Sequence, residues 1–204
     1  MLRLRRKKQI CKRPVSMMAR ESRMRLIKKA FPAVEGLTPE LAHSLAAMEE
    51  VRAQLRKAVN EMSVEDLGRQ AVAGAHSIGA LVLHIGESEW FWLNCVIRGH
   101  ELTDEDRQQT FWDVLKDPEA FAAKNYSADF CLETIDGIRR EMHGFLSSLT
   151  DASLESVYSY TRGQTTMEAS LRWILHHLVD HEAQHKGQIL MLKRLLSGKT
   201  EDFI

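Results

Sequence analysis

The chain has 204 residues, and its 28 Lys and Arg side chains balance 28 Asp and Glu side chains, so the formal net charge is zero. With 44% apolar and 27% charged residues, the composition is typical of a globular protein, and the neutral sum argues against a nucleic-acid binder. No apolar run approaches the roughly 18 residues that a transmembrane helix needs, which excludes a membrane-spanning protein.

The charge is unevenly distributed along the chain. Residues 1–29 hold 12 basic side chains and one acid, for a net charge of +11, whereas the other residues hold 16 basic and 27 acidic side chains, for −11. We expect residues 1–29 to form a basic, disordered tail, or an extension upstream of a true start at Met17, Met18 or Met24. Such a tail can also contact nucleic acid or anionic lipid, although the acidic body would oppose nucleic acid. Residues 30–204 form the predicted domain.

The first predicted helix begins at Thr38-Pro39-Glu40, because Thr can cap a helix, Pro suits its first position and Glu complements its dipole. Apolar residues at helical spacing continue it to near Met62. The sequence Ser63-Val64-Glu65-Asp66 has the pattern of a capping box and predicts a short helical turn.

Three further helices are predicted in the same way. The second extends from near Ser77 to Val96, the third from Phe130 to Leu149, and the fourth from Thr165 or Thr166 to about Leu196. Gly198 lies where a helix stop is expected. The segment 98–127 is polar, with one short amphipathic piece around Phe111, Trp112 and Leu115, and residues 157–160 favour a brief extended stretch. These elements predict an all-α protein, a four-helix bundle with substantial connections, preceded by the basic tail.

Four of the nine histidines fall within ten residues, at His176, His177, His181 and His185. Residues four apart in a helix differ by about 40° in rotation and about 6 Å along the axis, so His181 and His185 share one face, in line with the apolar stripe of the fourth helix. Two core imidazoles need either hydrogen-bonding side chains or a divalent metal ion, and the metal explains the pair better.

Two histidines are too few to hold a metal ion, so another helix has to supply a third ligand. His84 is the best candidate, because it interrupts the most apolar stretch of the second helix, Ile78–Ile85. Glu87 and Glu89 are weaker candidates, as ligands or as partners of the ligands.

The string His181-Glu182-Ala183-Gln184-His185 also matches HExxH, the signature of zinc proteases in which Glu is the general base. The metzincin continuation is missing, because Gln188 and Met191 stand where Gly and His would be required. Glu201 is the only Glu among the 19 residues after His185, which leaves little room for a downstream Glu ligand. A peptidase is therefore disfavoured.

The segments HSIGALVLHIGESEWFW and LRWILHHLVDHEAQHKGQI resemble the DinB-like (YfiT-like) superfamily of metal-dependent bundle proteins, over about residues 38–196. The second segment carries the spacing typical of that family, His177, His181 and His185 followed by Lys186-Gly187-Gln188. Relatives commonly have Arg at the position of Lys186 and often have His at the position of Gln184.

The resemblance implies a three-histidine site made by His84, His181 and His185, for zinc or nickel, with open coordination positions. It implies that His177 supports the site without binding the metal. Characterised relatives include transferases and isomerases that use a low-molecular-weight thiol, which the metal binds as thiolate. Relatives are often homodimers, which leads us to expect a homodimer here.

We therefore expect a metal-dependent small-thiol S-transferase or small-molecule hydrolase, with Glu182 or a water on the metal as base. The alternative is a non-catalytic, metal-binding stress-response bundle. The expected partner is a small-molecule substrate, with neither nucleic acid nor membrane. Three widely separated cysteines with no CxxC motif, and no signal peptide, favour a cytoplasmic location.

Overall fold

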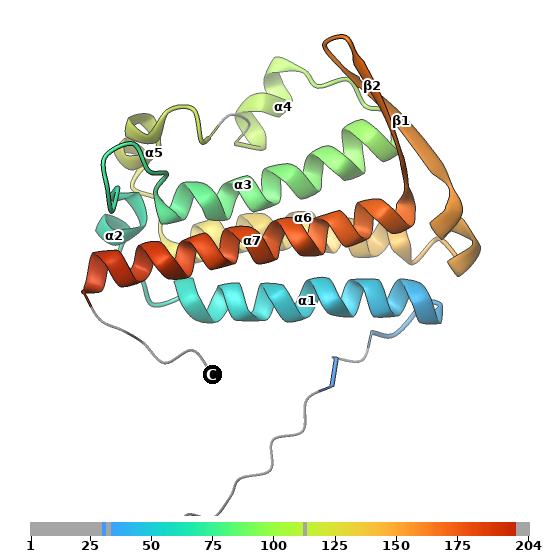
Figure 1. The fold of residues 1–204 in the computed structure, drawn as a ribbon, viewed down its shortest axis with the longest axis horizontal. Coiled ribbons are helices and arrows are strands. Elements are labelled where there is room, and N and C mark those ends of the chain that lie inside the picture. The colour runs from blue at the N-terminus through green and yellow to red at the C-terminus, as the bar shows by residue number, and fades with distance from the viewer. Residues whose placement is uncertain (1–29, 32–33, 112–113, 199–204) are drawn as a thin grey trace, which may run out of the picture. The chain divides into compact units, whose positions relative to one another are not determined.

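The computed structural model describes residues 30–31, 34–111 and 114–198, so the predicted basic tail of residues 1–29 lies outside the described residues. Four long helices and a hairpin dominate the fold (Figure 1). In chain order the elements are α1 (Pro39–Val59), α2 (Val64–Gly68), α3 (Ile78–Trp90), the π-helix η1 (Phe91–Ile97), α4 (Asp104–Gln109), α5 (Pro118–Lys124), α6 (Ala128–Leu146), the 3-10 helix η2 (Asp151–Glu155), β1 (Val157–Arg162), β2 (Thr165–Ser170) and α7 (Leu171–Ser197).

The long helices α1, α3, α6 and α7 form the predicted four-helix bundle, which confirms the expected fold class (Figure 1). Helix α3 packs against α6 and α7, and α1 packs against α7 and α6. Helices α1 and α3, although consecutive among the long helices, therefore lie diagonally across the bundle. None of the helices in the described ranges is long and apolar enough to span a membrane.

The helix starts are set by short polar side chains. Ser77, Ser127 and Ser170 each accept a hydrogen bond from a backbone N–H in the first turn of α3, α6 and α7. Thr38 at the start of α1 differs from the expectation, because its side chain makes no cap bond of its own. Instead Asp151, from η2, accepts hydrogen bonds from the Thr38 hydroxyl and from two backbone N–H groups of α1. A distant residue thus completes this helix end.

Two predicted elements differ from the structure. The last helix begins at Leu171 rather than at Thr165, because the residues before it form the antiparallel hairpin β1–β2, in which Val157 pairs with Ser170 and Arg162 with Thr165. The predicted amphipathic piece around residues 111–115 is not a helix at its described residues. Phe111 has a left-handed backbone with φ 59°, and the short helices α4 and α5 lie on either side of this segment.

The core consists of two hydrophobic clusters. One lies among Leu55, Ile78, Ile135 and Ile189, and the other among Met48, Leu93, Met142 and Leu178. Each long helix contributes one charged residue to a buried set of ion pairs inside the bundle, and these four residues form what we call the charged layer: Arg52 of α1, Glu89 of α3, Arg139 of α6 and Glu182 of α7.

Candidate metal centre

The structure brings His84, His181 and His185 together, with one ring nitrogen of each within 4.8 Å of the others. His84 comes from α3 and the other two from α7, which is the neighbour of α3 in the bundle. The Nε2 atoms of His181 and His185 are 3.1 Å apart, and the ring centroid of His84 is 5.2 Å from that of His181 and 5.0 Å from that of His185. The cluster therefore brings together the three histidines that the sequence offered as candidate ligands.

The histidines lie at the edge of the core rather than inside it. His181 and His185 are half-buried, and the fully buried residue of this helical turn is Glu182, which is 2% exposed. The apolar stripe of α7 thus continues through Glu182, one position away from the expected face. This shift places the ring of His181 at the wall of a cavity, while the carboxylate of Glu182 enters the bundle.

The ring nitrogens on the outer side of the cluster have hydrogen-bond partners. His84 Nδ1 donates to Glu87 Oε2 at 2.8 Å, and His185 Nδ1 donates to Gln188 Oε1 at 2.8 Å. Each bond fixes the tautomer of its ring and leaves Nε2 as the nitrogen that carries a lone pair. Such bonds are typical of metal-binding histidines, because they fix the orientation of the ring and raise the basicity of the ligand nitrogen.

The surroundings also keep the α7 imidazoles uncharged. Burial, reinforced by the nearby rings of His185 and His84, lowers the pKa of His181 to about 3. Burial likewise lowers the pKa of His185, against the opposing effect of its bond to Gln188. A neutral imidazole is the form that binds a metal ion, so these residues are in the correct state at neutral pH.

The donor set fits a divalent cation. Two nitrogens that are each about 2.1 Å from one ion lie roughly 3.0 to 3.4 Å apart for bond angles between 90° and the tetrahedral value. The 3.1 Å between the Nε2 atoms of His181 and His185 falls within this range. Three imidazole nitrogen donors suit zinc and other borderline divalent metals better than calcium or magnesium, which prefer oxygen ligands.

His177, one turn before His181, packs instead of joining the cluster. Its ring stacks on Trp173, with centroids 4.9 Å apart and planes 5° apart, and meets Trp92 edge-on at 5.2 Å. It therefore belongs to the aromatic packing next to the candidate ligands.

Glu182 is engaged on the other side of α7. Its Oε1 accepts a hydrogen bond from Arg52 Nε at 2.6 Å, and its Oε2 accepts from Arg139 Nη2 at 2.9 Å. Both guanidinium groups also bind Glu89, the carboxylate that the sequence offered as a weak ligand candidate. Both carboxylate oxygens of Glu182 are thus engaged inside the bundle, and Glu182 does not line the cavity beside the histidines, so its placement argues against Glu182 as the general base. It equally weakens the protease interpretation of HExxH.

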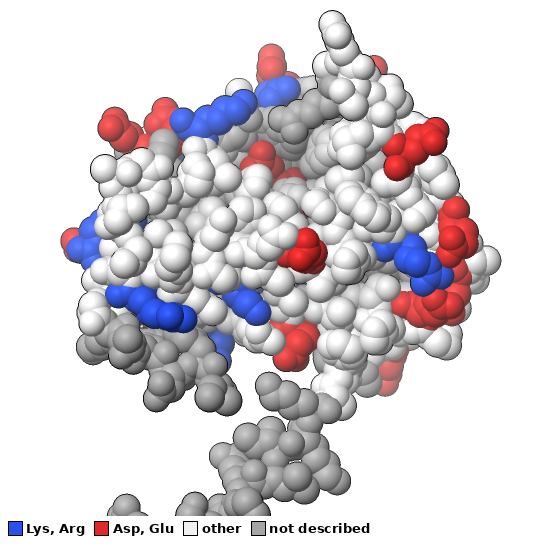
Figure 2. All heavy atoms as spheres, in the orientation of Figure 1, with Lys and Arg blue, Asp and Glu red and all other residues white. Residues whose placement is uncertain are grey.

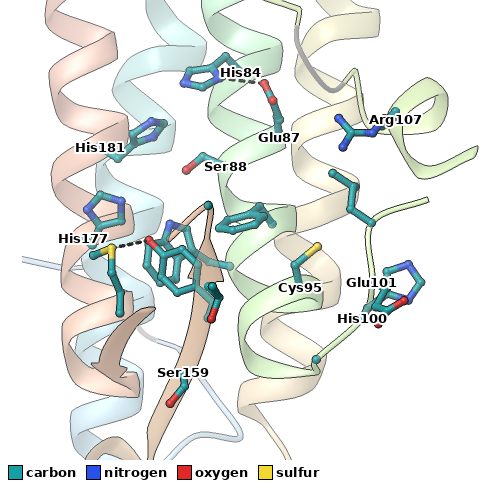
Figure 3. Close-up of a pocket in the computed structure, with 18 of the residues that line it drawn as sticks. His84, Glu87, Ser88, Cys95, His100, Glu101, Arg107, Ser159, His177 and His181 are labelled. Carbon is teal, nitrogen blue, oxygen red and sulfur yellow. Dashed lines mark hydrogen bonds and ion pairs between the residues drawn. The ribbon is translucent and has the colours of Figure 1, made fainter. Parts of the chain in front are cut away.

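A cavity of about 1010 Å³ adjoins the histidine cluster. His84, Glu87, His177 and His181 line one part of it, and the rest of its wall comes from η1, the segment through α4 to Lys116, and the hairpin (Figure 3). In the close-up Arg107 of α4 points towards Glu87, across the cavity from α7. Figure 2 shows a hollow in the surface beside α4, on a face where acidic and basic side chains are interspersed. A volume of this size accommodates an organic molecule in addition to a metal ion.

Comparison with known proteins identifies the family. The model of the DinB superfamily matches residues 47–189, which include all three candidate ligands. The chain belongs to the DinB superfamily. The uncharacterized protein YizA from Bacillus subtilis (strain 168) is similar to this chain, with 26% identity over 147 residues, which are 72% of this chain and 82% of YizA.

Two solved structures support the same fold for this DinB superfamily member. A conserved protein from Enterococcus faecalis superposes with a TM-score of 0.59 at 14% identity, covering 77% of this chain and 96% of the other. YfiT from Bacillus subtilis is described as a probable metal-dependent hydrolase with an unusual four-helix bundle topology. It superposes with a TM-score of 0.53 at 19% identity, covering 82% of this chain and 94% of YfiT.

Several residues around the site were not anticipated from the sequence. Arg52 lies four residues after Met48 and Arg139 three residues before Met142, so each continues the apolar stripe of its helix. A charged residue on an apolar stripe is a signal of a buried ion pair that the sequence could have provided.

Of the cavity residues in the hairpin, Ser159 and Tyr160 lie in the stretch that the sequence predicted to be extended, and β1, which contacts η1, confirms that stretch. Met167 had no comparable signal, because it lies in β2, where the sequence pattern predicts the start of a helix.

Proposed function

We propose that this protein is a metal-dependent enzyme that acts on a small organic molecule, either by hydrolysis or by transfer of a small thiol. The observation that supports it most directly is that two members of the three-histidine cluster, His84 and His181, line the 1010 Å³ cavity. A structural metal site is usually closed by four protein ligands, whereas three ligands beside a cavity leave room for a substrate. The description of YfiT as a probable metal-dependent hydrolase is consistent with this proposal.

A divalent ion held by His84, His181 and His185 would supply Lewis acidity at neutral pH. Imidazole ligands suit zinc and nickel, which are the ions we propose. Glu87 holds His84 in its ligating orientation. The packed rings of Trp92 and Trp173 keep water away from one side of the cavity.

The first test is metal content. We expect purified protein loaded with zinc or nickel to retain about one ion per chain after dialysis, measured by mass spectrometry of the metal. His181→Ala and His185→Ala should lose it, whereas His176→Ala should retain it, because His176 is an exposed residue of the same helix and lies outside the cluster. Equal retention by all three variants would contradict the site.

The second test is turnover. Metal-loaded protein should hydrolyse members of a panel of small esters and amides, or join a low-molecular-weight thiol to a small electrophile, and His181→Ala should abolish the reaction. A protein that binds stoichiometric metal but transforms no member of either panel would favour the non-catalytic metal-binding alternative.

A further inference from the structure

One wall of the cavity is lined by large apolar side chains. They are Phe91 and Trp92 of η1, Tyr160 and Met167 of the hairpin, and Trp173 of α7, and we call them the aromatic wall. Met167 is 41% exposed and Trp173 is 44% exposed, although both are large hydrophobic residues. Their exposed area faces the cavity that adjoins the candidate metal centre. Exposed apolar area concentrated in a concave site is a mark of ligand binding.

The aromatic wall is held in place by its own contacts. The ring of Trp92 meets Tyr160 edge-on at 5.3 Å and Trp173 at 5.6 Å. The Tyr160 hydroxyl donates to the sulfur of Met167 at 3.1 Å. Three separate elements are therefore locked together, and the wall is formed before any ligand arrives. A preformed apolar surface loses little entropy when a ligand binds to it.

The opposite side of the cavity is polar and has no dominant sign of charge. Its charged lining includes Glu101, Arg107 and Lys116, from the segment around α4. Acidic and basic groups occur together there, so this side gives no reason to expect a polyanion or a polycation. The aromatic wall is the feature that discriminates among small molecules.

We propose that the substrate carries an uncharged aryl or bulky alkyl group, which packs on the aromatic wall while its reacting group lies at the histidine cluster. This inference rests on the proposed function, because it needs an open metal centre at one end of the cavity. It goes further by assigning the apolar half of the cavity to substrate recognition and by excluding small, wholly polar substrates such as unsubstituted sugars.

Two hydroxamates test this proposal, because both chelate a metal ion and they differ only in a phenyl or a methyl group. We expect zinc-loaded protein, titrated in a calorimeter, to bind benzohydroxamate roughly tenfold or more tightly than acetohydroxamate. Met167→Ser should reduce this preference severalfold and leave the affinity for acetohydroxamate unchanged. Met191→Ser is the matched control and should keep the full preference, because Met191 is an exposed methionine of α7 that does not line the cavity.

The outcomes separate the two proposals. Binding of acetohydroxamate with no gain for the phenyl compound would overturn the inference and leave the metal-dependent function standing. A phenyl preference that survives both Met167→Ser and Trp173→Leu would place the aryl group elsewhere and also overturn it. Failure of zinc-loaded protein to bind either hydroxamate would overturn the open metal centre, and the inference with it.

Discussion

Arg52 and Glu182 lie 130 residues apart in the chain and are joined by two hydrogen bonds in the middle of the bundle, at 2.6 Å and 3.2 Å. Both side chains are 2% exposed. With Glu89 and Arg139 they complete the charged layer, in which two positive and two negative groups balance. Although burial opposes its charge, the pKa of Arg139 is raised, chiefly by the neighbouring Glu89. Because the layer takes one residue from each long helix, it fixes how the helices align along the bundle axis.

Removing one member of the charged layer should destabilise the fold strongly. We expect Arg52→Met to lower the free energy of unfolding by about 3–5 kcal/mol, because it leaves two carboxylates buried with one guanidinium group. The matched control is Arg172→Met, which removes a half-exposed arginine that pairs with Glu40 and Glu155. It should have a much smaller effect, because ion pairs at the surface are screened by solvent and contribute little. Urea unfolding measures both, and equal effects would show that the buried layer has no special role.

Glu87 should control how tightly the candidate centre binds metal. We expect Glu87→Ala to weaken zinc binding about 10- to 100-fold, because His84 then loses the carboxylate that orients it, and Glu87→Gln to have a smaller effect, because the amide oxygen can still accept. Competition with a chromophoric chelator measures both. Glu101→Ala is the control, because Glu101 is an acidic residue that lines the same cavity, whereas the carboxylate bonded to His84 is that of Glu87. Unchanged affinity in Glu87→Ala would contradict the proposed role.

The close approach of α3 and α6 depends on Gly86. A Cβ atom at Gly86 would lie 2.7 Å from Ile135 Cγ2 and 3.1 Å from Ile138 Cδ1. We expect Gly86→Ala to destabilise the protein by about 1–3 kcal/mol through overpacking.

Gly144 provides the comparison for this prediction. It lies in α6 with no atom within 4 Å of an added Cβ, so Gly144→Ala should stabilise by up to about 1 kcal/mol through helix propensity. In thermal denaturation we expect Gly86→Ala to lower the melting temperature and Gly144→Ala to raise it. A rise in both variants would contradict the close approach of the helices at Gly86.

Asp151 makes the stability of α1 depend on pH. Its bond from the Thr38 hydroxyl, followed by bonds from the backbone of α1, lowers the pKa of the Asp151 carboxyl. A carboxyl whose pKa is lower in the folded protein stabilises the fold at pH values above its pKa in the unfolded chain, which is about 4. This stabilisation is lost as the pH falls through the pKa of the folded state. Asp151→Asn should therefore melt at a lower temperature than the wild type at pH 7. The two melting temperatures should converge towards pH 3, and a constant difference would exclude this cause.

The bundle and the three candidate ligands could be predicted from the sequence because both depend on periodicity. Leu41, Leu45 and Met48 lie on one face of α1 by spacing alone, and His84 was detectable as a polar break in an apolar run. The exact rotation of α7 about its axis could not be predicted. The structure buries Glu182 where the sequence pattern placed the neighbouring histidines, and this choice depends on ion pairs with Arg52 and Arg139, which are distant in the sequence.

The hairpin could not be predicted in the same way, because its second strand, Thr165–Ser170, merges with the start of α7 in a helical pattern. Its turn nevertheless had a signal. Gly163 and Gln164 form a two-residue loop between β-branched and aromatic residues, and Gly163 has a positive φ of 61°. Ser170 then ends the strand and caps the helix, a double role that depends on tertiary structure.

The π-helix η1 continues α3 with a wider turn than an α-helix. A π turn holds one more residue than the α turn that would replace it, so the extra residue is absorbed there and the helix before and after it keeps its orientation. His84 and Glu87 precede this turn, whereas Trp92 and Cys95 lie within it and line the cavity. Loss of one residue between Phe91 and Ile97 would therefore remove part of the cavity wall and leave the candidate metal ligands in place, so the size of the cavity can change independently of the histidine cluster.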